Sequence, residues 1–119
     1  MTTQNFIDAL GRINFTHIHE SAEYNSIRSD DGFEVVYSVR LATFTKDLPL
    51  QMVLQLRYND SHVMSFGAET EADNRSLVDW YVETRERARR AEITAQKDVV
   101  RAGYIKFMDY VESVYEKVD

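Results

Sequence analysis

The carboxy-terminal part of the chain, from residue 74 to residue 118, contains no proline and has the composition of one long helical segment. A single straight helix of that length would span about 67 Å at the ~1.5 Å rise per residue of an α-helix. A compact domain of 119 residues has a radius of gyration of only about 13–14 Å. A continuous helix must therefore extend well beyond the rest of its own domain, unless it breaks and folds back.

Two apolar stripes run along this segment on nearly opposite sides, if successive residues turn by about 100°. The first stripe is narrow and carries mostly small side chains: Leu77, Tyr81, Thr84, Ala88, Ala91, Ala95 and Val99. The second stripe is broad and strongly apolar: Val100, Tyr104, Phe107, Met108, Val111, Val114, Tyr115 and Val118. One straight helix cannot lay both stripes on one flat sheet, so one of them needs a different surface.

Two arrangements satisfy this geometry. A break near residues 96–103, where Gly103 is the weakest helix former, would produce two helices. Alternatively, the helix is continuous and its halves pack on different surfaces, one of which belongs to another subunit. Because the second stripe is more apolar, we expect residues 100–118 to pack on the protein's own sheet. The alanine-lined stripe of residues 77–95 is then the expected interface, since small side chains let helices approach closely.

The preceding residues predict a short helix and an antiparallel sheet. Phe6, Ile7 and Leu10 lie at helical spacing between a threonine cap, Thr2 or Thr3, and the terminator Gly11. Alternating or β-branched runs predict four strands, at residues 13–21, 33–44, 50–58 and 62–66.

The connections between these elements set the expected topology. The segment before the second strand leads to an Asp-Gly hairpin turn at residues 31–32. Short connections between successive strands indicate a meander. Ser76 and Asp79 fit a capping box at the start of the long helical region. The expected fold is α+β, in a single domain of residues 1–119.

Composition and charge exclude several classes of protein. The chain contains no cysteine, which removes disulfides, thiolate metal sites and cysteine nucleophiles. The net charge is −6, and residues 1–72 carry five basic against ten acidic groups, so the basic surface typical of nucleic-acid binding is missing. No apolar run is long enough to span a membrane, and the first residues lack the features of a signal peptide. We therefore expect a cytoplasmic protein.

An arginine-rich stretch, "ETRERARRAE" at residues 83–92, lies in the first half of the long helical region. Glu83–Arg87 and Glu86–Arg90 are spaced for i,i+4 ion pairs, and Glu86–Arg89 for an i,i+3 pair, as on a solvated helix face. The alternative is a partner-binding surface, because tryptophan, tyrosine and arginine anchor protein interfaces. Its candidate residues are Trp80, Tyr81, Thr84, Arg85, Ala88 and Arg89.

His17 and His19 are the clearest candidates for metal-binding or catalytic residues. On a strand they project from the same face, and such a pair can hold zinc or another divalent ion. A third ligand would be His62, Glu20 or Glu34. Two histidines on the surface of a strand are the simpler interpretation. Neither a phosphate-binding loop nor a nucleophile elbow occurs in the sequence.

These observations favour a non-enzymatic accessory protein that occludes or holds a partner protein, as an inhibitor, adaptor or chaperone-like protein, and that forms a homodimer. Its size, its acidity and its lack of catalytic patterning are common among small accessory proteins, including phage-encoded inhibitors. The alternative is a small metal-dependent enzyme or ligand-binding protein that uses His17 and His19. Nucleic-acid binding is a weaker alternative.

Overall fold

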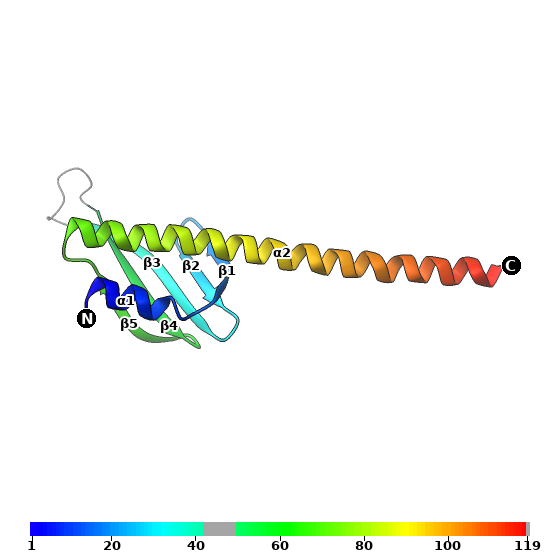
Figure 1. Cartoon of the computed structure of the whole chain (residues 1–119), viewed down its shortest axis with the longest axis horizontal. Coiled ribbons are helices and arrows are strands. Elements are labelled where there is room, and N and C mark those ends of the chain that lie inside the picture. Colours follow the sequence, from blue (N-terminus) through cyan, green and yellow to red (C-terminus); the bar gives the residue numbers. More distant parts are fainter. Residues whose placement is uncertain (42–49, 119) are drawn as a thin grey trace.

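The computed structural model describes residues 1–41 and 50–118, and side chains as far as residue 114. Two helices and five strands follow one another in the order α1 (Thr3–Leu10), β1 (Phe15–Glu20), β2 (Asn25–Ser29), β3 (Phe33–Leu41), β4 (Leu50–Tyr58), β5 (Ser61–Gly67) and α2 (Glu71–Val118). The strands form one antiparallel sheet in which each pairs with the next along the chain. Both helices pack on the same face of this sheet (Figure 1).

The α+β class and the meander are confirmed, but the sheet has five strands rather than the predicted four. The additional strand is β2, in the segment that was predicted only as a connection. Ile27 is its one large apolar residue, and the serines and arginine around it hide the alternation of a strand. The Asp-Gly turn is confirmed as the β2–β3 hairpin, with Gly32 at φ 102°. The predicted end of the next strand, residues 42–44, lies outside the described residues.

The core lies between the sheet and the two helices. Its sheet side consists of alternate residues, such as Val35 and Leu54, which are both fully buried. α1 adds Phe6, whose ring stacks on Phe66 of β5 with centroids 4.8 Å apart. The predicted cap of this helix is confirmed, because the Asn5 backbone N–H donates to Thr2 Oγ1 over 3.1 Å.

The long helix is continuous over 48 residues, from Glu71 to Val118. Of the two expected arrangements, the structure therefore has the continuous helix and not the break near residues 96–103. A single glycine costs a helix about 1 kcal/mol relative to alanine, which is too little to end a proline-free segment at Gly103. The molecule measures 78 × 28 × 22 Å and has a radius of gyration of 20.8 Å, and α2 projects far beyond the sheet (Figure 1).

The start of α2 also differs from the prediction. Thr70 is the cap, because its Oγ1 accepts a hydrogen bond from the Asp73 backbone N–H over 3.1 Å. The predicted capping box at Ser76 and Asp79 is wrong. Ser76 lies inside the helix, where its hydroxyl donates to the Ala72 carbonyl over 3.2 Å.

The two stripes of α2 do not pack as expected. The first stripe lies on the sheet as far as Ala88, and its residues Leu77, Tyr81, Thr84 and Ala88 are all buried. The prediction that residues 100–118 pack on the sheet is wrong, since Val100, Tyr104 and Phe107 are exposed. The link between β5 and α2 determines which stripe lies on the sheet. The short link after β5 places the beginning of α2 over the sheet, and the first 22 residues of the helix already span about 33 Å.

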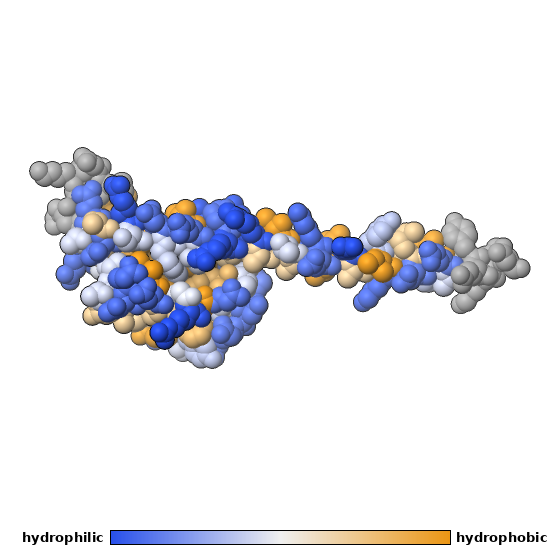
Figure 2. Space-filling view, in the orientation of Figure 1, coloured by the Kyte–Doolittle hydropathy of each residue, from blue (hydrophilic) through white to orange (hydrophobic). Residues whose placement is uncertain are grey.

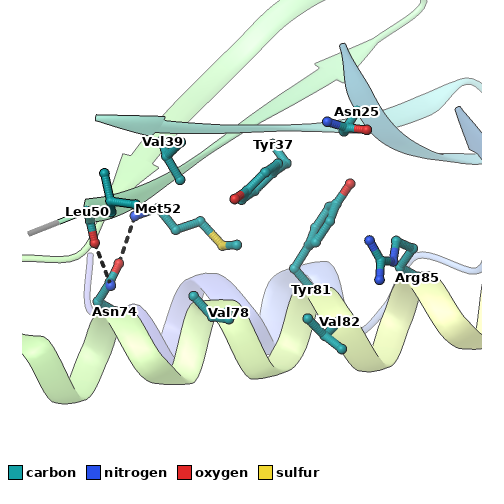
Figure 3. Close-up of a pocket in the computed structure, with 10 residues that line it drawn as sticks. All are labelled: Asn25, Tyr37, Val39, Leu50, Met52, Asn74, Val78, Tyr81, Val82 and Arg85. Carbon is teal, nitrogen blue, oxygen red and sulfur yellow. Dashed lines mark hydrogen bonds between the residues drawn. The ribbon is translucent and has the colours of Figure 1, made fainter. Parts of the chain in front are cut away.

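One polar side chain fixes the beginning of α2 to β4. Asn74 is buried, and its Oδ1 accepts from the Met52 N–H over 2.8 Å while its Nδ2 donates to the Leu50 carbonyl over 3.1 Å (Figure 3). We expect Asn74→Ala to lower the free energy of unfolding by about 1–3 kcal/mol, because it leaves a buried N–H without an acceptor. Urea denaturation measures this change. Arg75→Ala, on the exposed side of the same turn, serves as the control and should be nearly neutral.

Candidate docking surface

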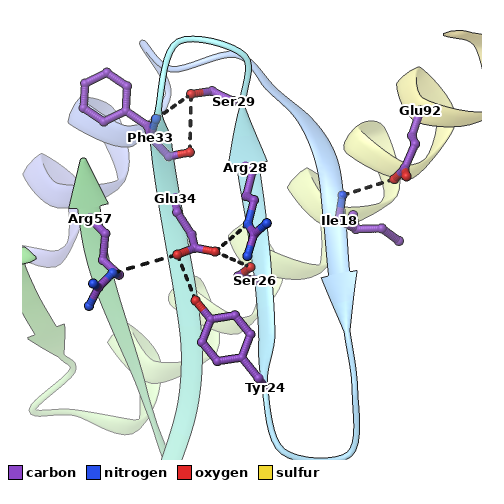
Figure 4. Close-up of polar contacts among 9 residues, drawn as sticks. All are labelled: Ile18, Tyr24, Ser26, Arg28, Ser29, Phe33, Glu34, Arg57 and Glu92. Carbon is purple, nitrogen blue, oxygen red and sulfur yellow. Dashed lines mark hydrogen bonds and ion pairs between the residues drawn. The ribbon is translucent and has the colours of Figure 1, made fainter. Parts of the chain in front are cut away.

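The second half of α2 leaves the rest of the protein after Glu92. The Oε2 atom of Glu92 accepts a hydrogen bond from the Ile18 backbone N–H over 3.2 Å, at the outer strand of the sheet (Figure 4). We call residues 93–118 the arm, and residues 1–41 and 50–92 the head. Within the described part of the chain, the arm extends from the head as a single helix (Figure 1).

The arm carries a row of side chains at alternating spacings of four and three residues, which is the heptad spacing of helices that pair with other helices. We call this row the seam: Ile93, Lys97, Val100, Tyr104, Phe107, Val111 and Val114. Val100 is 72% exposed, Tyr104 63% and Phe107 60%. Apolar residues are visible along the arm in Figure 2. An exposed apolar row of this kind is a candidate site of interaction.

Four of the six residues proposed for partner binding pack on the head's own sheet. Trp80 meets Phe15 edge-on, with ring centroids 6.1 Å apart. Tyr81 stacks on Tyr37 at 5.2 Å, and Thr84 and Ala88 are buried. These contacts hold α2 against the sheet, so these side chains contribute to the core of the head.

The other two residues of that set, Arg85 and Arg89, bind a carboxylate of the sheet. Arg85 lies 3.5 Å and Arg89 3.1 Å from Glu20 Oε1, at the end of β1. Of the three ion pairs predicted within the helix, Glu86–Arg89 is present at 3.9 Å. The arginine-rich stretch thus attaches the helix to β1. Sequence spacing could not reveal this contact, because Glu20 and Arg89 are 69 residues apart.

The two histidines share one face of β1, as predicted. Ile18 and Glu20 face α2, so His17 and His19 face the opposite side. His17 Nε2 is hydrogen-bonded to Asp30 Oδ1 at 2.7 Å, and His19 meets Tyr24 edge-on. Among the side chains that the structure describes, no three histidine or carboxylate groups lie close enough to hold a metal ion.

The candidates for a third metal ligand lie elsewhere or have other partners. His62 belongs to β5, at the opposite edge of the sheet. Glu20 points towards the helix and its arginines. Glu34 belongs to a separate polar cluster on the face that α2 leaves uncovered. His62 and Glu20 are thus directed away from the histidine pair, and Glu34 is bound by its own hydrogen-bond donors.

That cluster surrounds Glu34, which is only 8% exposed. Its carboxylate accepts hydrogen bonds from the Tyr24 hydroxyl and the Ser26 hydroxyl, both over 2.8 Å, and from Arg28 Nε over 2.6 Å (Figure 4). Arg57 Nε lies at 3.9 Å. Burial alone would raise the pKa of Glu34, but hydrogen bonds from Arg28, Tyr24 and Ser26 outweigh burial and hold it below its usual 4.5. The ionised carboxylate therefore joins β2, β3 and β4.

A pocket of about 280 Å³ opens between the beginning of α2 and strands β3 and β4 (Figure 3). Its wall is mostly apolar, with Asn25 and Arg85 at one end. Burial raises the pKa of Tyr81 to about 12, so its hydroxyl stays protonated near neutral pH and does not act as a base. Among the described lining residues there is no histidine, carboxylate, serine or cysteine. This set of side chains offers no nucleophile or general base.

None of the described helices is long and apolar enough to cross a membrane. Comparison with known protein families, with curated proteins and with solved structures finds no match to this chain.

Proposed function

We propose that this protein is a non-enzymatic accessory protein that binds protein chains through the seam of its arm, and that it works as a homodimer. One observation carries this proposal: the most apolar stripe of the longest element is exposed, while the narrower stripe on its other side already forms the core. A partner that docks on the arm would lie beyond the sheet. The protein would then occlude this partner or hold it.

The composition of the arm indicates that its helix needs packing along the seam to be stable. Ten of the 22 residues from Ile93 to Val114 are β-branched or aromatic, and such residues favour helices less than alanine by up to about 0.7 kcal/mol each. Gly103 weakens the helix further. In proteins, most of the stability of a helix comes from packing of its apolar face. A partner along the seam would supply that packing.

Paired substitutions on the same stretch of helix test the proposal. The seam variant is Val100→Arg with Phe107→Arg. The matched control is Val99→Arg with Ile105→Arg, whose side chains are 73% and 51% exposed but lie off the seam. Light scattering should find the wild type and the control at twice the chain mass of 13.9 kDa, and the seam variant at the single chain mass, because two arginines on an apolar interface remain unpaired.

Capture from native lysate completes this experiment. The seam variant should lose any protein that the wild type and the control retain. Circular dichroism and Trp80 fluorescence verify that the head of each variant remains folded. If the seam variant keeps both the mass and the captured proteins of the wild type, the arm is not the docking surface.

A further inference from the structure

We propose that the seam is occupied by the arm of a second copy, which runs antiparallel, with the two-fold axis between Tyr104 and Phe107. This inference rests on the proposed function and specifies the homodimer. In this register Tyr104 packs against the partner copy's position 107, Val100 against position 111, and Lys97 against position 114. The seam is about three heptads long, which is the length at which heptad patterns indicate a coiled coil.

The position of Lys97 distinguishes antiparallel from parallel pairing. It is the one charged residue of the seam. In a parallel dimer in register, the two copies of Lys97 would face each other at the same layer, where their like charges repel. In the antiparallel register each Lys97 faces Val114. Its alkyl stem covers the valine, and its ammonium group reaches water beside the last turns of the opposite helix.

The charge along α2 is distributed for the same orientation. Residues 94–102 carry two basic side chains and one acidic side chain, whereas residues 109–117 carry one basic side chain and three acidic ones. The antiparallel register places residues 109–117 of each helix beside residues 94–102 of the other, so that opposite net charges meet. The negative end of the helix dipole adds to this attraction. A parallel pair in register would place each of these two segments beside its own copy, so that like net charges meet.

Gly103 fits the same register. It lies beside the seam, and a Cβ atom at this position would meet nothing within 4 Å. In the antiparallel register it lies opposite Tyr110, which is 66% exposed in the single chain. A glycine lets a large side chain approach the backbone closely. This arrangement gives a reason for a glycine in the middle of a helix that it would otherwise only weaken.

The antiparallel and the parallel pair differ in the distance between a residue of one arm and the same residue of the other arm. In the antiparallel register the two copies of Val100 are 11 residues apart along the helices, which is about 16 Å, whereas Val100 and Val111 of opposite chains are neighbours. In a parallel pair the two copies of Val100 are neighbours. Because the chain contains no cysteine, single Val100→Cys and Val111→Cys variants of the full chain report on these distances directly.

Cross-linking with a bismaleimide shorter than that separation is the test. We expect the mixture of Val100→Cys with Val111→Cys to give cross-linked dimer, and each variant alone to stay near background. Ala102→Cys, exposed and off the seam, mixed with Val100→Cys gives that background, because residue 102 lies nine residues from the position that faces Val100. Cysteine is a small apolar side chain, so light scattering should find both seam variants dimeric.

The outcomes separate this inference from the proposed function. If the protein is dimeric and Val100→Cys cross-links with itself, the antiparallel arrangement is wrong and the arm remains the docking surface. If the wild type is monomeric, a second copy is not the occupant, and capture of another protein that the Val100→Arg and Phe107→Arg pair abolishes leaves the proposed function standing. If that pair changes neither mass nor capture, the proposed function itself is overturned.

Discussion

Replacing Leu77 by alanine is expected to lower the free energy of unfolding by about 2–5 kcal/mol, the usual range for removing a buried leucine side chain. Leu77 has no exposed surface, and it lies in the core between α2 and the sheet. The cavity left by the substitution would separate the helix from the sheet along the stripe that holds them together. A loss of this size is a large part of the stability of a small domain.

Urea denaturation followed by fluorescence measures this loss in the head, because Trp80 is the only tryptophan and packs on Phe15. Val99→Ala is the matched control, on the same helix and 73% exposed. Its effect should stay within about 0.5 kcal/mol. Equal losses for the two variants would contradict the placement of Leu77 in the core.

The second large effect is expected from Glu34→Gln, which keeps the shape of the side chain and removes its charge. Glu34 accepts from Tyr24, Ser26 and Arg28, and hydrogen bonds to a charged group contribute about 1.5–3 kcal/mol. A glutamine amide presents two donors to a cluster that needs acceptors. We therefore expect a loss of stability in this range near neutral pH, and little change for Glu23→Gln in an exposed position.

This loss should depend on pH in a defined direction. The pKa of Glu34 lies below its usual 4.5 in the folded protein. The ionised carboxylate therefore stabilises the fold above the unfolded pKa, and this contribution disappears as the pH falls through the lower, folded value. The difference between wild type and Glu34→Gln should be constant above about pH 5 and shrink below it. Urea midpoints over a pH series measure it, and a difference that does not shrink in acid would rule out this role.

The sequence predicted the parts of the fold that depend on local pattern. The alternation in residues 50–58 and the Asp-Gly turn at residues 31–32 each specify a strand or a hairpin without reference to distant residues. β2 was missed because Ile27 is its only large apolar residue, and a strand that pairs on both sides needs little side-chain signal of its own. Without β2, the cluster around Glu34 could not be foreseen, since two of its donors, Ser26 and Arg28, belong to that strand.

The assignment of the stripes failed for a different reason. Hydrophobicity alone indicates that the stripe with Phe107 is the better core. Which stripe reaches the sheet is decided instead by the short link before Thr70, which places the beginning of the helix there. Likewise, Arg85 and Arg89 bind Glu20, which no spacing within the helix can indicate. The residues on the arm were thus recognised as apolar, but their exposure depends on chain connectivity.

The separation of the two stripes also affects how this chain can evolve. Because the seam adds nothing to the core of the head, substitutions along it are expected to leave the folding of the head intact and to act on the proposed docking alone. Selection on the proposed docking surface would therefore act independently of selection on folding, on opposite sides of one helix.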